Sequence, residues 1–121
     1  MLKIVVFLVI FAAMASIAFA APGDTLWTRT YGGSSFDYGH SVQQDTTDGG
    51  YIVAANVTNR AWILKLDSSG NLTWDKTYGG SNLDGAFSIQ QTSDGGYIAA
   101  GYTESFGAGG EDFWILKLNS P

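Results

Sequence analysis

The stretch Trp27–Ser34 has the sequence Trp-Thr-Arg-Thr-Tyr-Gly-Gly-Ser, and it returns 47 residues later as Trp-Asp-Lys-Thr-Tyr-Gly-Gly-Ser at Trp74–Ser81. The repetition continues outward from this stretch toward the C-terminus. Asp-Gly-Gly-Tyr-Ile occurs at 48–52 and 94–98, and Trp-Ile-Leu-Lys-Leu occurs at 62–66 and 114–118. A repeat of roughly 40–50 residues built from short strands is typical of propeller blades. The sequence therefore predicts two copies of one β-unit.

Turn residues divide each repeat into four expected strands, A to D. The Asp-Gly-Gly tripeptide suits a tight hairpin between strands A and B, because glycine accepts the positive φ that such turns need. The expected ranges are 41–46 and 87–92 for A, 51–55 and 97–101 for B, 61–66 and 113–118 for C, and 25–31 and 72–78 for D. We predict an all-β chain of two four-stranded antiparallel propeller-type blades, which form a partial β-propeller or a ring-forming oligomer.

The first twenty residues have the pattern of a secretory signal peptide. Lys3 supplies a positive charge, residues 4–17 are nearly all apolar, and Ala18-Phe19-Ala20 matches a small-x-small cleavage site. We expect cleavage after Ala20, so that the protein is secreted or held at the cell surface. The alternative is an uncleaved membrane anchor, because the apolar run nearly reaches the length of a span. The expected organisation is a signal peptide at 1–20, a first blade at 21–70 and a second at 71–121.

Composition narrows the classes of partner. The chain has 11 Asp and Glu against 6 Lys and Arg, and it has no cysteine. No basic cluster occurs after the first twenty residues, which argues against nucleic acid as a partner. The absence of cysteine excludes disulfides and thiolate metal sites. Stability must therefore come from the core or from association with other blades.

Candidate binding residues lie in the loops that join strand D to A and strand B to C, since both kinds of loop share one rim of a propeller. Carboxylates accept hydrogen bonds from hydroxyl groups and aromatic rings stack on C–H faces, so this rim suits a sugar. The predicted ligand-binding residues are Asp37, Tyr38, Asp84, Phe106, Glu111 and Asp112. The alternative for Asp37 and Asp84 is that each caps backbone N–H groups of its own loop. The alternative for Glu111 and Asp112 is an ordinary solvated loop.

Other chemistry-bearing residues are assigned structural roles. The four tryptophans recur with the repeat, as packing between blades demands, so an inter-blade role is predicted for Trp27, Trp62, Trp74 and Trp114. His40 is the single histidine, and one histidine alone makes neither a metal site nor a triad. We therefore predict no catalytic residue, no metal and no cofactor.

The repeat also resembles known propellers. Asp67–Trp74, Asp-Ser-Ser-Gly-Asn-Leu-Thr-Trp, resembles the tryptophan-docking motif of quinoprotein-type propellers, with an Asp-to-Gly spacing one residue shorter. The longer pattern is similar to the β-propeller repeats of secreted bacterial and archaeal surface proteins. The resemblance implies a non-catalytic scaffold or binding module whose partners are other blades, by self-association or in a longer array, and a carbohydrate or surface protein.

Two rival functions remain. One is a lectin-like two-blade protomer that oligomerises into a closed propeller and binds carbohydrate between blades. The other is a quinone-dependent dehydrogenase, which shares the docking motif. The dehydrogenase is disfavoured, because it depends on a full ring and on a ligand set that the sequence does not contain.

Overall fold

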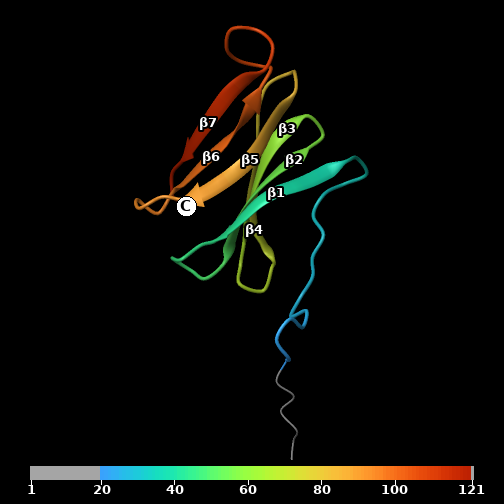
Figure 1. Ribbon diagram of the computed structural model, residues 1–121, viewed down its shortest axis with the longest axis vertical. Coiled ribbons are helices and arrows are strands. Elements are labelled where there is room, and N and C mark those ends of the chain that lie inside the picture. Colours follow the sequence, from blue (N-terminus) through green and yellow to red (C-terminus); the bar gives the residue numbers. More distant parts are fainter. Residues whose placement is uncertain (1–19, 121) are drawn as a thin grey trace, which may run out of the picture.

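The computed structural model describes residues 20–120, which fold as two antiparallel sheets (Figure 1). The strands are β1 (Asp37–Gln44), β2 (Tyr51–Val57), β3 (Arg60–Leu66), β4 (Leu72–Tyr78), β5 (Asp84–Gln91), β6 (Tyr97–Thr103) and β7 (Asp112–Leu118). The strand order is β1-β2-β3-β4 in the four-stranded sheet and β5-β6-β7 in the three-stranded sheet. The predicted all-β architecture is confirmed.

The predicted signal peptide lies outside the described residues, apart from Ala20. Among residues 20–120, no helix is long and apolar enough to cross a membrane.

The prediction of a strand at 25–31 is wrong for this structure, and the second sheet consequently has three strands rather than four. A strand needs a neighbouring backbone with which to pair. By the repeat, this segment would pair with the edge strand β7. It runs instead along the other side of the molecule from β7 (Figure 1). Its repeat counterpart β4 does pair, with β3, over the predicted range Leu72–Tyr78.

The main core lies between the two sheets. β5 packs across β1, β2 and β3. The buried side chains are mostly small or β-branched, which lets the sheets approach closely. They are Ile52, Ala54, Ala61 and Ile63 from the four-stranded sheet, and Ala86, Ile89, Tyr97 and Ala99 from the three-stranded sheet. Hydrogen bonds cross the same seam: the Gln91 N–H donates to the Gln43 side chain at 2.6 Å, and the Ala86 N–H donates to the Asn56 side chain at 2.9 Å.

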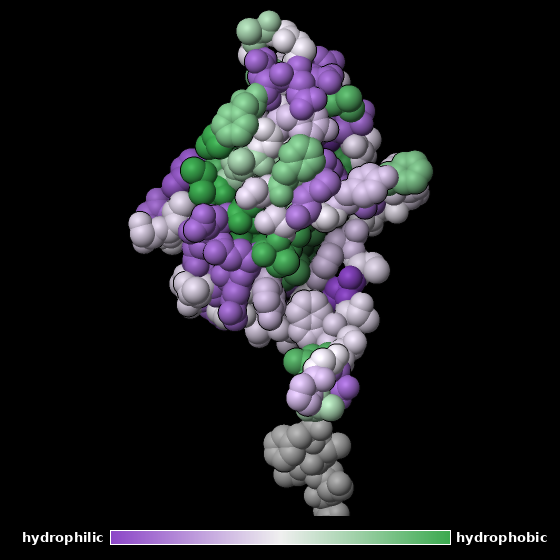
Figure 2. Space-filling view, in the orientation of Figure 1, coloured by the Kyte–Doolittle hydropathy of each residue, from purple (hydrophilic) through white to green (hydrophobic). Residues whose placement is uncertain are grey.

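A second apolar cluster covers the outer face of the four-stranded sheet. It consists of Ala55, Trp62, Leu64 and Leu66. Tyr31 packs against this cluster, and Trp27 meets the ring of Tyr51 edge to face at 5.8 Å. Apolar side chains also reach the surface in several places between polar ones (Figure 2).

Candidate binding surface

The two sheets carry a β-bulge at the same place in their first strands. In β1 the pairing passes from Gly39 directly to Ser41, and in β5 it passes from Ala86 to Ser88. His40 and Phe87 are thus extra residues without a partner in the ladder. A bulge re-aims the side chain that it carries. Here it brings the two rings together edge to face, with centroids 4.8 Å apart.

These two rings belong to an aromatic row, which consists of Phe36, Tyr38, His40, Phe87 and Tyr102. The first four are exposed and Tyr102 is half-buried. Successive ring centroids are 6.4, 6.5, 4.8 and 5.3 Å apart along the row. Phe36 is 81% exposed, Tyr38 56% and Phe87 49%. The row crosses the seam, because Phe36 lies directly before β1, Tyr38 and His40 lie in β1, and Phe87 and Tyr102 belong to the three-stranded sheet. Contiguous exposed rings of this kind mark interaction sites more often than scattered ones.

Of this row, the sequence predicted only Tyr38 as a binding residue. A signal was present, since Phe36, Tyr38 and His40 alternate at the period of a strand and so fall on one side. The other two rings had no such signal. Phe87 faces His40 only because both strands bulge, and Tyr102 joins the row through β6.

The three predicted aspartates, Asp37, Asp84 and Asp112, each stabilise the turn that precedes them. Each accepts a hydrogen bond from the backbone N–H four positions earlier, at 2.8 Å for Asp37 and Asp84 and 2.9 Å for Asp112. A positive-φ glycine lies five positions before each of them, and a Cβ there would overlap the carboxylate; these are Gly32, Gly79 and Gly107. The carboxylates therefore fix the tight turn that leads into β1, β5 or β7.

Asp84 is more completely bonded than Asp37. Its carboxylate also accepts hydrogen bonds from the hydroxyls of Thr103 and, at 2.7 Å, Ser105. Burial disfavours the charged form of Asp84, but these hydrogen bonds outweigh it and lower the pKa below its usual value. Asp84 is opposite Thr103 in the ladder, whereas Asp37 is opposite Val57, which has no hydroxyl group. The Oδ1 atom of Asp37 is buried without a hydrogen-bond partner in the described structure.

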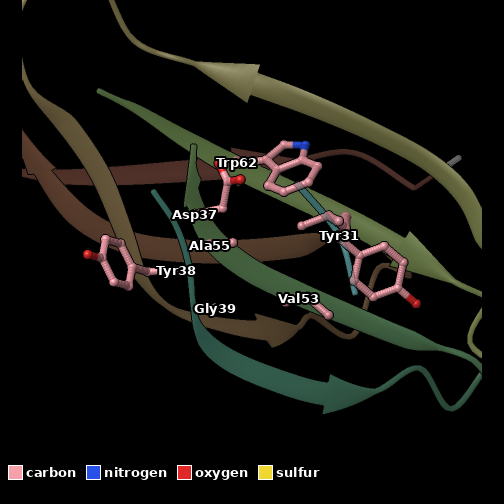
Figure 3. Close-up of a pocket in the computed structure, with 8 residues that line it drawn as sticks. Tyr31, Asp37, Tyr38, Gly39, Val53, Ala55 and Trp62 are labelled. Carbon is pink, nitrogen blue, oxygen red and sulfur yellow. The ribbon is translucent and has the colours of Figure 1, made fainter. Parts of the chain in front are cut away.

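Asp37 and Tyr38 point to opposite sides of β1 (Figure 3), as successive residues of a strand do. Asp37 borders a hollow of about 200 Å³ on the outer face of the four-stranded sheet. The hollow is lined by Tyr31, Asp37, Tyr38, Gly39, Val53, Ala55, Trp62 and Leu64. The ring of Tyr38 turns away from Trp62 and Tyr31, toward the aromatic row.

The remaining predicted residues lie around the β6–β7 loop. Phe106 packs on Trp114 with centroids 5.8 Å apart, and Glu111 is exposed. Asp84 is connected to this loop through Ser105. Within residues 20–120, no hydrogen bond or ring contact joins these groups to Asp37 and Tyr38, so the predicted rim is divided into two places.

The four tryptophans occupy different environments. Trp62 is 9% exposed, and its indole N–H donates to Asp75 at 2.7 Å. Trp74 and Trp114 are half-buried and pack against the core between the sheets. Trp27 is 37% exposed.

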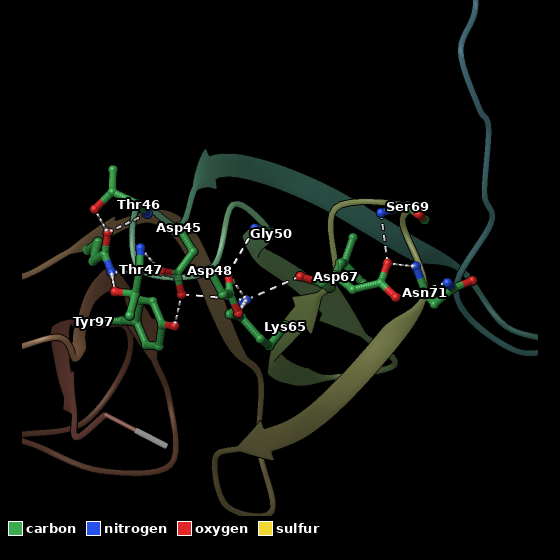
Figure 4. Close-up of polar contacts among 12 residues, drawn as sticks. Asp45, Thr46, Thr47, Asp48, Gly50, Lys65, Asp67, Ser69, Asn71 and Tyr97 are labelled. Carbon is green, nitrogen blue, oxygen red and sulfur yellow. Dashed lines mark hydrogen bonds and ion pairs between the residues drawn. The ribbon is translucent and has the colours of Figure 1, made fainter.

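A polar network of Asp45, Asp48, Lys65 and Tyr97 joins the two sheets beside the turn between β1 and β2 (Figure 4). The Lys65 ammonium is 2% exposed and lies 2.7 Å from Asp48 and 3.5 Å from Asp45. The Tyr97 hydroxyl donates to Asp45 from the other sheet. Burial opposes the ionisation of Asp45, but the hydrogen bonds from Tyr97 and Thr47 and the charge of Lys65 prevail and lower its pKa to about 2. Because Asp45 also accepts hydrogen bonds from Tyr97 and Gln91 of the other sheet, these contacts hold the two sheets together.

No group of three His, Asp or Glu side chains suited to a metal ion occurs among the described residues. Comparison with known proteins finds no protein-family model that matches the chain and no similar curated protein.

Proposed function

We propose that this chain is a non-catalytic scaffold and binding module, secreted or held at the cell surface, whose two sheets are blades of a β-propeller. The repeat and its resemblance to propeller repeats support the architecture. The signal-peptide pattern of residues 1–20 supports export. The observation that carries the binding role is the aromatic row.

The row suits a ligand with an extended apolar face. Four of its five rings are exposed and all follow one another at 4.8 to 6.5 Å, so a chain-like ligand contacts several at once. Proline-rich segments dock on aromatic-lined grooves of recognition domains in this way. The phenol of Tyr38 adds a hydrogen-bonding group to the apolar contact.

The second candidate is the lectin-like function, in which the ligand is carbohydrate. One observation favours it: the row spans the seam, with Tyr38 and His40 on one sheet and Phe87 and Tyr102 on the other. A sugar bound there lies between two blades, with its C–H face against the rings.

The test is a titration of the protein with decaproline and, separately, with cello- and chito-oligosaccharides, followed by calorimetry. Tyr38→Ala and Phe87→Ala should each weaken binding at least tenfold, since each removes an exposed ring from the row. Leu72→Ala is the control, because Leu72 is 48% exposed and lies outside both the row and residues 25–31. Binding of the peptide supports the first function, and binding of an oligosaccharide supports the second. Equal loss in the control variant, or binding by none of the probes, rejects the row as the binding site.

Export has its own test. N-terminal sequencing of the exported protein should give Ala21-Pro22-Gly23. Recovery of intact Met1–Ala20 in membranes would instead identify the anchored form.

A further inference from the structure

We propose that residues 25–31 of a second copy of this chain add to the free edge of β7 as the fourth strand of the three-stranded sheet. The inference rests on the proposed propeller architecture, but it assigns the partner and the contact. It draws on four observations: the position of the segment, the exposure of β7, the match of two surfaces and the register of β3 with β4.

Residues 25–31 already lie on the four-stranded sheet as β4 lies on the three-stranded sheet. Trp27 packs on Tyr51 at 5.8 Å, and its repeat counterpart Trp74 packs on Tyr97 at 6.3 Å. The Tyr31 hydroxyl donates to the Gly70 carbonyl and anchors the end of the segment. The segment thus has the position of an outer strand such as β4, but no strand pairs with it in the described structure.

β7 lacks the complementary neighbour. β3 and β7 share the sequence Trp-Ile-Leu-Lys-Leu, yet all six residues from Ala61 to Leu66 are buried, whereas exposed and half-buried residues alternate along β7. Ile63 is fully buried and its counterpart Ile115 is 46% exposed. The same side chains therefore differ only in what covers them. β3 pairs with β4, and the second sheet covers its Ile63 face. Among the described residues, nothing pairs with the corresponding edge of β7 or covers its Ile115 face, although its opposite face packs against the core.

The outer faces of the two sheets match each other. The outer face of the three-stranded sheet exposes Ile98, Phe113 and Ile115, whose counterparts in the four-stranded sheet form the core between the sheets. The outer face of the four-stranded sheet presents the hollow beside Trp62. Placing one copy head to tail on another repeats the contact that already exists within the chain. Such a contact is heterologous, and it forms a ring where the rotation closes.

The register follows from the pairing of β3 with β4. Ile63 is opposite Lys76, and Leu64 is opposite Asp75. Carried over through the repeat, this pairing sets Ile115 opposite Arg29 of the second copy, and Leu116 opposite Thr28. Opposed residues in an antiparallel pair have Cβ atoms about 4.5–5.5 Å apart, which is close to the separation that a disulfide bridges.

Disulfide trapping tests this register, because the chain has no cysteine of its own. Full-length Arg29→Cys and Ile115→Cys proteins are mixed and oxidised mildly, and a covalent dimer containing one of each is expected. The pair Arg29→Cys with Phe113→Cys is shifted by two residues and should cross-link at least tenfold more slowly. The double variant Ile63→Cys/Lys76→Cys is the positive control, since that pair is opposed within one chain.

The outcomes separate clearly. A mixed dimer at the predicted pair, with slow reaction at the shifted pair, supports the proposal. If the Arg29→Cys/Ile115→Cys double variant forms only an intrachain disulfide, the segment completes its own sheet and the proposal is overturned. If the positive control cross-links but the mixed pair does not, it is also overturned. The assay needs no ligand, so loss of binding at the aromatic row does not affect it.

Discussion

At the scale of single residues, the contacts of Asp45 show how the sheets are held together. Its carboxylate accepts hydrogen bonds from Tyr97 and Gln91 of the other sheet and lies beside the buried Lys65. A buried ion pair contributes little on average, but removal of one partner leaves an uncompensated charge. Asp45 is therefore a residue whose loss is costly although it has no part in the proposed binding site.

Stability should fall in acid partly because of Asp45. Its folded-state pKa of about 2 lies below its ordinary value of 3.8. The charged form thus stabilises the fold above about pH 4, and this contribution is lost as the pH falls toward 2. In Asp45→Asn, urea unfolding should show a loss of about 1–2 kcal/mol at pH 7 and a weaker decline between pH 4 and pH 2. Parallel curves for the two proteins would contradict the assignment.

The difference between Asp37 and Asp84 gives a reciprocal pair of variants. Thr103→Val removes a hydrogen bond from a buried carboxylate and should destabilise by about 1–3 kcal/mol. Val57→Thr places a hydroxyl opposite Asp37, whose Oδ1 lacks a partner, and should be neutral or stabilising by up to about 1 kcal/mol. Thermal unfolding measures both. Destabilisation of equal size in the two variants would show that the residue opposite the aspartate does not act through this bond.

At the scale of elements, the pairing between the first and second strands is more crowded in one sheet than in the other. Gly101 lies opposite the β5 bulge, where a Cβ would come within 1.8 Å of the Gly85 carbonyl oxygen. Gly39 beside the β1 bulge has open space around it, and the second repeat already has Ala86 at that place. The same residue type is thus required at one position and optional at the other.

Gly101→Ala should consequently destabilise by about 3 kcal/mol, because backbone atoms cannot move aside as a side chain can. Gly39→Ala is the control and should stay within about 0.5 kcal/mol of the native protein. Both values come from chemical denaturation. A small effect at Gly101 would mean that β5 and β6 separate more easily than their pairing indicates.

The sequence was informative where strands pair within the chain. The repeat and its turn residues predicted β2, β3 and β4 closely, since hairpin partners lie near in sequence. They failed at 25–31, because pairing depends on a neighbour that these residues do not have in the structure. They also missed the start of β1 and β5, where a bulge interrupts the alternation that identifies a strand. Phe87 and Tyr102 were missed because they come beside His40 only through the two bulges and the pairing of β5 with β6, which have no sequence signal.

At the scale of the whole molecule, protection is unequal between repeats. β3 is a central strand with both faces covered, and β7 is an edge strand with one face in solvent. Local opening costs less where fewer apolar contacts are broken.

Hydrogen exchange should reveal this asymmetry. In Ile115→Lys, a variant expected to prevent association, the amides of β3 should exchange at least tenfold more slowly than those of β7, despite their shared sequence. Mass spectrometry of peptic fragments separates the two strands. Equal protection would show that the three-stranded sheet is as stable alone as the four-stranded sheet.

The paired bulges have a consequence for how the length of the chain can change. Gly39 is paired with Ala55 and Ser41 with Ala54, so His40 lengthens β1 by one residue that has no partner in β2. Deleting His40 leaves both pairs intact and joins them as neighbours in a regular strand. A deletion elsewhere in β1 that keeps the bulge would exchange the inward and outward sides of the residues beyond it. His40 and Phe87 therefore mark, in each repeat, the position in the first strand where a codon can be lost while every other side chain keeps its side of the sheet.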